Sequence, residues 1–239
     1  SDWLEIGGGA VLRVVFAGAG TWPRICTVIH MGYPFEYVIT RPEPKPRHVL
    51  VLYAHPVEDS FHASLHRTVV ETLRDVGHVV DDCDLYLEEF SPVLTRQERL
   101  DYHDLETNQN NVKPYVDRLL AADALVVVHP VWIYGFPAIL KGFFDRVLIP
   151  GVMFDHIDGR VKMKLHNIRK LAGVVTYGGT RSRAFLAGDP PRRNIKRVLR
   201  AMVHPTAECR YLAQYAVDLT DFRAREQFLA KVQREMEVF

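Results

Sequence analysis

The chain is poor in cysteine and has no long apolar run. Its three cysteines, Cys26, Cys83 and Cys209, are an odd number without CxxC spacing, so we expect no disulfide framework and predict a reducing, cytoplasmic location. No apolar run approaches membrane-spanning length, so we expect no membrane insertion. The formal net charge is only +1 over 239 residues, which argues against a general attraction to nucleic acid or anionic lipid.

The first part of the sequence differs from the rest and ends in the proline-rich stretch RPEPKPR (41–47). Three prolines disfavour regular structure and suit an extended tether. We therefore predict an N-terminal extension and tether over residues 1–46 and one domain over residues 47–239. The GAG at 18–20 resembles part of a dinucleotide-binding fingerprint, but the third glycine is missing and Pro23 comes early for the helix. We expect the extension to pack on the domain or on a partner subunit.

From His48 onward, short apolar runs alternate with amphipathic stretches. Such alternation is typical of an α/β fold with a doubly wound parallel sheet. The predicted strands are 48–54, 78–84, 124–129, 170–176 and 208–216, and the predicted helices are 62–76, 112–121, 137–147, 192–203 and 221–237. A short helix before residue 108 and a longer excursion over 150–169 complete the pattern.

Two strand ends carry residues suited to a ligand. Trp132 follows the apolar run ALVVV (124–128), and ligands of open α/β sheets bind at the carboxyl ends of the strands. The strand at 48–53 leads to a helix with Ser60 as its N-cap, where free N–H groups favour a phosphate. His55 and Ser60 add side-chain donors. These residues predict a phosphate-bearing cofactor that stacks on an aromatic ring.

Five motifs resemble one known family. They occur in the order YAHP (53–56), SF (60–61), PVLT (92–95), HPVWIYGFPAILKGFFDRV (129–147) and TYGG (176–179). Together they resemble the NAD(P)H quinone dehydrogenase, or DT-diaphorase-like, family of flavodoxin-fold flavoproteins. The resemblance covers about residues 47–239. It implies a flavodoxin-like parallel sheet with strand order 2-1-3-4-5, a flavin with FAD ahead of FMN, NAD(P)H as electron donor, and a homodimer that shares its active sites.

The resemblance also implies which residues bind the flavin. The residues around the phosphates would be His55, Ser60, Phe61, His62 and Ala63. Those along the isoalloxazine would be Pro130, Val131, Trp132, Ile133 and Tyr134. Those beside the pyrimidine of the flavin would be Thr176, Tyr177, Gly178 and Gly179. His62 stands where the family usually has asparagine. Trp132, with Phe154 and His156 of the partner subunit, would line the cavity for the electron acceptor.

The chain lacks the tyrosine and histidine that relatives place after the Gly-Gly turn. Arg181 or Arg183 is our candidate for stabilising charge on the reduced flavin, with Tyr177 and His156 as further candidate catalytic residues. The expected activity is hydride transfer from NAD(P)H through flavin N5 to a quinone or similar small-molecule acceptor. The alternative is a flavin-bearing regulatory subunit, similar to the ancillary proteins of bacterial potassium-efflux transporters.

Other charged groups have less specific patterns. His62 and His66 have zinc-binding spacing but no third ligand is evident, so we predict no metal site. We interpret Asp81, Asp82 and Asp84 as solvated loop charge. The basic helix over 192–203 is either a solvated face or an anion site for the 2′-phosphate of NADPH or the adenylate of FAD.

Overall fold

A computed structural model describes residues 3–6, 10–17, 24–30, 37–39 and 46–239. Contacts divide the chain into two units, Ser1–Lys45 and Pro46–Phe239. The first unit contains an antiparallel sheet with strand order β1-β2-β3-β4, formed by Trp3–Ile6, Ala10–Ala17, Arg24–His30 and Tyr37–Ile39. The GAG at 18–20, Pro23 and most of the proline tether lie outside the described residues. The sequence pattern predicted an extension here and no sheet.

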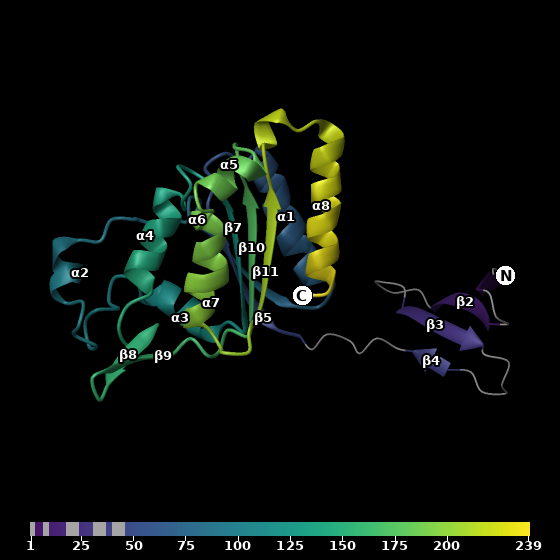
Figure 1. Cartoon of the computed structure of the whole chain (residues 1–239). Coiled ribbons are helices and arrows are strands. Elements are labelled where there is room, and N and C mark those ends of the chain that lie inside the picture. The colour runs from purple at the N-terminus through teal and green to yellow at the C-terminus, as the bar shows by residue number, and fades with distance from the viewer. Residues whose placement is uncertain (1–2, 7–9, 18–23, 31–36, 40–45) are drawn as a thin grey trace. The chain divides into compact units, whose positions relative to one another are not determined.

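The second unit is built on a five-stranded parallel sheet. Its order is β6-β5-β7-β10-β11, which is 2-1-3-4-5 when its strands are counted along the chain, so the predicted order is confirmed (Figure 1). The strands are β5 (His48–Tyr53), β6 (Val79–Asp84), β7 (Ala124–Pro130), β10 (Lys170–Thr176) and β11 (Glu208–Gln214). Every residue of β7 is buried, as its unbroken apolar run predicts for a central strand.

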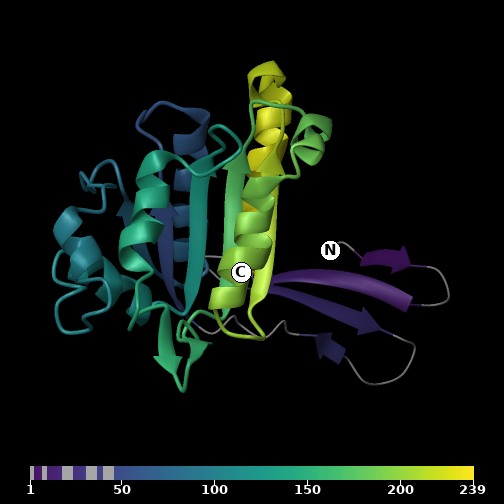
Figure 2. The same cartoon turned by 60° about the vertical axis from the view of Figure 1, so that its left-hand side comes forward.

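Helices cover both faces of this sheet (Figures 1 and 2). Successive residues of β5 point to opposite faces, so Val49 and Val51 belong to one core cluster and Leu50 and Leu52 to the other. One face carries α1 (Phe61–Asp75) and α8 (Phe222–Glu237). The other carries α3 (Lys113–Ala121), α4 (Ala138–Val147) and the helical stretch formed by α6 (Pro190–Arg193), a π-helical turn (Asn194–Leu199) and α7 (Arg200–Met202).

The close approach of α4 to the preceding loop depends on one glycine. A Cβ atom built on Gly142 would lie 2.2 Å from the carbonyl oxygen of Pro92 and 2.4 Å from its Cβ. Gly142 is buried on the face of the sheet that α3 and α4 cover, next to Phe143 and Phe144. Only a residue without a side chain fits between the helix and the Pro92 segment at this point.

Three smaller elements refine the sequence prediction. The predicted basic helix starts at Pro190, two residues before its expected start, and a separate short helix, α5 (Arg181–Leu186), precedes it. The side chain of Thr180 caps α5 by accepting a hydrogen bond from the N–H of Arg183. The predicted excursion contains a hairpin of β8 (Phe154–Ile157) and β9 (Arg160–Met163), and the short helix before residue 108 is α2 (Arg96–Leu100).

Candidate functional site

A hollow of about 380 Å³ lies where the carboxyl ends of β5, β7 and β10 meet, and we call it the strand-end hollow. It forms beside the point where the strand order reverses, between β5 and β7, which is the usual place of a ligand in this architecture. The lining residues are His55, Ser60, Phe61, His62, Pro130, Val131, Trp132, Thr176, Gly178, Val217, Asp218 and Arg225.

The N-terminus of α1 supplies one wall of the hollow. Ser60 is the N-cap, as predicted, and its Oγ accepts a hydrogen bond from the N–H of Ala63 at 3.1 Å. The N–H groups of Phe61 and His62 have no acceptor within the described structure, because no earlier carbonyl lies within reach of them. Two free N–H groups at the positive end of a 15-residue helix favour an anion.

The imidazole ring of His55 belongs to the same wall. The N–H of Val57 donates a hydrogen bond to His55 Nδ1 at 3.1 Å, and Ser60 Oγ lies 3.0 Å from the same nitrogen. The same nitrogen lies 3.2 Å from the carbonyl oxygen of Val57, so all of these local contacts use Nδ1, which accepts in one tautomer and donates in the other. The Nε2 side of the ring takes no part in these contacts, and the His55 ring lines the hollow beside the free backbone donors of α1.

The loop after β7 is a tight turn that holds Trp132 at the hollow. Trp132 and Gly135 exchange two main-chain hydrogen bonds, 2.9 and 3.3 Å long. The intervening residues, Ile133 and Tyr134, both have positive φ angles of 49° and 52°. A β-branched residue such as isoleucine rarely adopts this conformation, so the turn is strained. Trp132 keeps 41% of its surface exposed, so its ring is accessible to a ligand.

The loop after β10 brings Thr176 and Gly178 to the hollow, with His62 packed behind Thr176. His62 is buried, and its Nδ1 lies 3.1 Å from Thr176 Oγ1. Its Nε2 has no partner among the described residues. The side chain of Tyr177 turns inward instead, and its hydroxyl donates to Asp189 at 2.6 Å and lies 2.6 Å from the Tyr211 hydroxyl. Tyr177 thus reaches the site through its main chain and not through its phenol.

Three lining residues were missed by the sequence reasoning: Val217, Asp218 and Arg225. Arg225 is the only arginine or lysine among the lining residues of the strand-end hollow. Its guanidinium lies 5.7 Å from the centre of the Phe61 ring and donates to the carbonyl oxygen of Val217 at 3.2 Å. The 3₁₀ turn Val217–Leu219 therefore fixes the arginine over the N-terminus of α1. No motif marks these residues, because their place depends on how α8 packs beside α1.

Several predicted site residues lie elsewhere. Phe154 and His156 belong to the β8–β9 hairpin, near the opposite end of the sheet, where His156 lines a separate hollow with His103 (Figures 1 and 2). Arg181 and Arg183 are exposed on α5. The remaining predicted residues surround the hollow without lining it. Ala63 is buried behind it, and Ile133 is 99% exposed. Gly179 leaves room for the hydroxyl of Tyr134, because a Cβ atom built on Gly179 would lie 3.2 Å from that oxygen.

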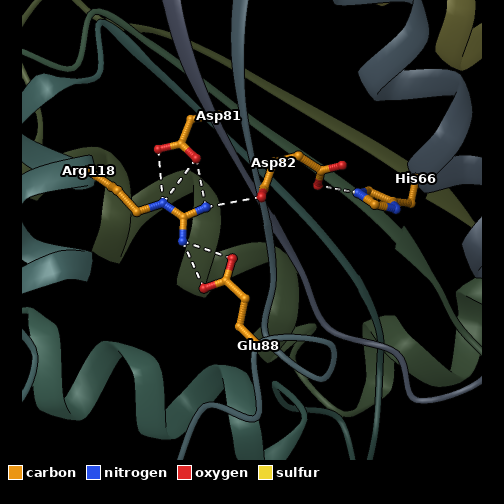
Figure 3. Close-up of polar contacts among 5 residues, drawn as sticks. All are labelled: His66, Asp81, Asp82, Glu88 and Arg118. Carbon is orange, nitrogen blue, oxygen red and sulfur yellow. Dashed lines mark hydrogen bonds and ion pairs between the residues drawn. The ribbon is translucent and has the colours of Figure 1, made fainter.

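Two acidic residues of β6, Asp81 and Asp82, are paired, so their interpretation as solvated loop charge is wrong (Figure 3). Asp84, at the end of the strand, has no charged partner among the described residues and accepts hydrogen bonds from the N–H groups of Tyr86 and Leu87. Arg118 binds Asp81 at 2.6 Å and Glu88 at 2.8 Å. Asp82 Oδ1 lies 2.7 Å from His66 Nε2, and the His66 ring stacks on Tyr53 at 4.1 Å. His62 and His66 therefore have different environments and do not form a pair.

Burial keeps two histidines beside the site uncharged. It lowers the pKa of His62 to about 3 and that of His129 to about 4. His129 Nδ1 donates to the carbonyl oxygen of Pro130 at 2.8 Å. Its other nitrogen has no partner among the described residues, so a protonated ring would place an unpaired charge in the core.

Acidification is therefore expected to destabilise the fold. Both pKa values are lower in the folded state than the usual 6.5, so the unfolded chain binds more protons between about pH 4 and 6.5. The contribution of the two uncharged histidines to the free energy of unfolding is complete above pH 6.5 and decreases as the pH falls. At pH 5 each of these histidines lowers the free energy of unfolding by on the order of 2 kcal/mol.

Urea denaturation at pH 7 and pH 5 measures this loss. His129→Asn keeps a donor for the Pro130 carbonyl but does not titrate, so this variant should lose about 2 kcal/mol less than the parent between the two pH values. An equal loss in parent and variant would show that His129 is not responsible.

In the part of the chain that the structure describes, no group of three or more histidine, cysteine or acidic residues is arranged to hold a metal ion. Among the same residues, no helix has both the length and the apolar character needed to cross a membrane.

Comparisons with known proteins identify the family of the domain. A family model described as "Flavodoxin-like fold" matches residues 47–235. The uncharacterized NAD(P)H oxidoreductase YcaK of Escherichia coli K12 is 31% identical over 173 residues, which cover 72% of this chain and 81% of that protein. The rat NAD(P)H dehydrogenase (quinone) 1 is 30% identical over 158 residues, which cover 59% of this chain and 57% of that protein.

A solved structure shows the same fold. The NAD(P)H:quinone oxidoreductase from Methanothermobacter marburgensis superposes with a TM-score of 0.70 at 25% sequence identity, over 80% of this chain and 98% of that chain.

Proposed function

The chain belongs to the flavodoxin-like fold family, and from that premise we propose that it is a flavin-dependent NAD(P)H oxidoreductase acting on a quinone or similar acceptor. The observation that carries the proposal is the strand-end hollow, which combines an accessible Trp132 with two free N–H groups at the start of α1. A flavin nucleotide needs both features, because it has a flat ring system and at least one phosphate.

The residues fit such a cofactor. The N–H groups of Phe61 and His62, with His55 and Arg225, would bind its phosphate, since donors on a helix N-terminus and a guanidinium both favour an anion. Trp132 and its loop would lie along the isoalloxazine. Gly178 would let the main chain approach the ring, because nothing projects from this residue into the hollow.

The bound flavin would supply the redox chemistry, accepting a hydride at N5 and passing its electrons to the acceptor. The protein would hold the ring against the β7 loop and leave one face open to donor and acceptor in turn. We keep Arg181 and Arg183 as candidates for stabilising the reduced ring, although both are exposed in a single chain. Tyr177 would act by positioning its loop.

We further propose a cytosolic homodimer in which Phe154 and His156 approach the hollow of the other subunit. Both residues lie far from their own strand-end hollow, as such an exchange requires (Figure 1). The free thiols of Cys83 and Cys209 fit a reducing compartment. None of the relatives reported above is named as a transporter subunit, so the regulatory alternative gains no support.

The visible spectrum of the purified protein tests the proposal. We expect flavin absorbance, a cofactor that chromatography after acid release identifies as FAD ahead of FMN, and rapid oxidation of NAD(P)H when a quinone is added. A protein that remains colourless after incubation with excess FAD and FMN would contradict the proposed function.

Replacing Arg225 should weaken flavin binding. Arg225→Gln removes the only arginine or lysine that lines the strand-end hollow, and we expect the flavin dissociation constant to rise about tenfold because a charge-assisted hydrogen bond is lost. Titration of the apoprotein with flavin, followed by fluorescence quenching, gives the constant. Arg234→Gln, an exposed arginine at the far end of α8, is the matched control and should bind like the parent. Equal affinity in both variants would place the phosphate elsewhere.

A further inference from the structure

A second and larger hollow, of about 560 Å³, lies between α5 and the helical stretch that begins at Pro190. We call it the basic hollow, because four of its lining residues are cations: Arg192, Arg193, Lys196 and Arg197. The last two belong to the π-helical turn Asn194–Leu199, a conformation that is rare in helices and frequent at functional sites.

These cations have no partners inside the described part of the chain. Other arginines of the domain are paired with carboxylates: Arg118 with Asp81, Arg146 with Glu98 and Arg210 with Glu208. The four side chains of the basic hollow form no ion pair and no side-chain hydrogen bond with any described residue. Four unpaired cations around one cavity repel each other, and an anion between them removes that repulsion.

The only acid of the basic hollow is held on its wall. Asp189 accepts the hydrogen bond of the Tyr177 hydroxyl at 2.6 Å, so one of its carboxylate oxygens is already engaged by a neutral donor. Gly188 and Asp189 both have positive φ angles, of 79° and 46°, in the turn between α5 and α6. The turn brings the main chain at Gly188 close to Arg193, whose Nη1 would lie 3.4 Å from a Cβ at the glycine.

Tyr177 connects the basic hollow to the strand-end hollow. Its main chain precedes Gly178, which lines the strand-end hollow, and its hydroxyl reaches Asp189, which lines the basic hollow. The ring is 1% exposed and stacks on Tyr215 at 4.5 Å. The length of one buried tyrosine side chain therefore separates the wall of the strand-end hollow from the wall of the basic hollow. This distance is well within the length of a dinucleotide.

We propose that the basic hollow binds the 2′-phosphate of NADPH while the nicotinamide lies on the open face of the flavin in the strand-end hollow, an inference that rests on the proposed function. A phosphate monoester is a compact dianion whose oxygens match guanidinium donors. Phe185 at the rim is 79% exposed, so its ring is accessible to the adenine of the same ligand. NADH lacks this phosphate, and the proposal therefore predicts a preference for NADPH.

The test uses the flavin-loaded full chain and the double variant Arg193→Gln/Arg197→Gln. We expect kcat/KM for NADPH to fall about tenfold and that for NADH to change less than about twofold. Calorimetric titration with 2′,5′-ADP should show the same loss of affinity, whereas 5′-AMP should bind weakly to parent and variant alike. Arg234→Gln on α8 carries the same change of charge outside the hollow and should keep the parental preference.

A third variant reverses the charge effect. Asp189→Asn keeps an acceptor for Tyr177 but removes the one negative charge, so 2′,5′-ADP should bind several times more tightly. Weaker or unchanged binding in this variant would overturn the proposal.

The remaining outcomes separate the source of the phosphate from the function itself. If the double variant loses affinity for ATP but keeps the parental ratio of NADPH to NADH, the hollow binds a separate organic phosphate and the assignment to the electron donor is wrong. If 2′,5′-ADP and ATP bind parent and variant equally, no phosphate binds there. A parent protein that binds no flavin would contradict the proposed function. The titration with 2′,5′-ADP does not require flavin, so it would still test the phosphate site in that case.

Discussion

Valine in place of Gly178 should abolish flavin binding and leave the fold intact. Gly178 lines the strand-end hollow, and even a Cβ there would lie 3.1 Å from Oδ2 of Asp218, which lines the same hollow. The two methyl groups of valine would extend further and occupy the space that we assign to the flavin. We expect a loss of affinity of about a hundredfold or more, which corresponds to roughly 2.7 kcal/mol of binding free energy.

Flavin titration of the apoprotein measures this effect, and urea denaturation of the same apoprotein checks the fold. Gly135→Ala is the matched control, because a Cβ at Gly135 meets its nearest atom at an ordinary 3.6 Å. The control should bind flavin like the parent. Parental affinity in Gly178→Val, with an unchanged unfolding curve, would show that the flavin does not occupy this hollow.

Alanine at Gly142 is expected to destabilise the domain by about 3 kcal/mol. In an open helix, a change from glycine to alanine would stabilise by about 1 kcal/mol. Here the new Cβ would lie 2.2 Å from the carbonyl oxygen of Pro92, and main-chain atoms have no rotamer by which to move away. The helix α4 must shift, and with it the buried side chains of Phe143 and Phe144.

Equilibrium denaturation in urea gives the change in the free energy of unfolding. Lys141→Ala tests the same helix one residue earlier, where the side chain is exposed and pairs only with Asp145, and it should change stability by less than about 0.5 kcal/mol. A Gly142→Ala protein as stable as the parent would mean that α4 and the Pro92 segment are farther apart than described.

The sequence predicted the fold well because the apolar pattern is local. The ALVVV run at 124–128 is typical of a buried strand, and Ser60 stands directly before a helix whose apolar residues recur at regular spacing. The strand order came from the resemblance of the motifs and agrees with the structure. Both predictions used short stretches in which neighbours along the chain decide the conformation.

The site was harder to predict where it depends on distant packing. Arg225 reaches the strand-end hollow because α8 lies beside α1, a contact between residues far apart in the sequence. The inward direction of Tyr177 depends on acceptors at Asp189 and Tyr211, which belong to other elements. The pairing of Asp81 with Arg118 likewise joins β6 to α3. Spacing along the sequence contains no information about these partners.

The turn at Ile133 and Tyr134 has a consequence for the speed of cofactor capture. Its two main-chain hydrogen bonds and its strained φ angles all belong to residues 132–135, so the chain itself sets the shape that holds Trp132. A ligand that meets a preorganised loop loses little free energy to ordering it. Association should therefore be limited by diffusion and orientation rather than by a rearrangement, and the cost of the strained turn is met once, when the chain folds.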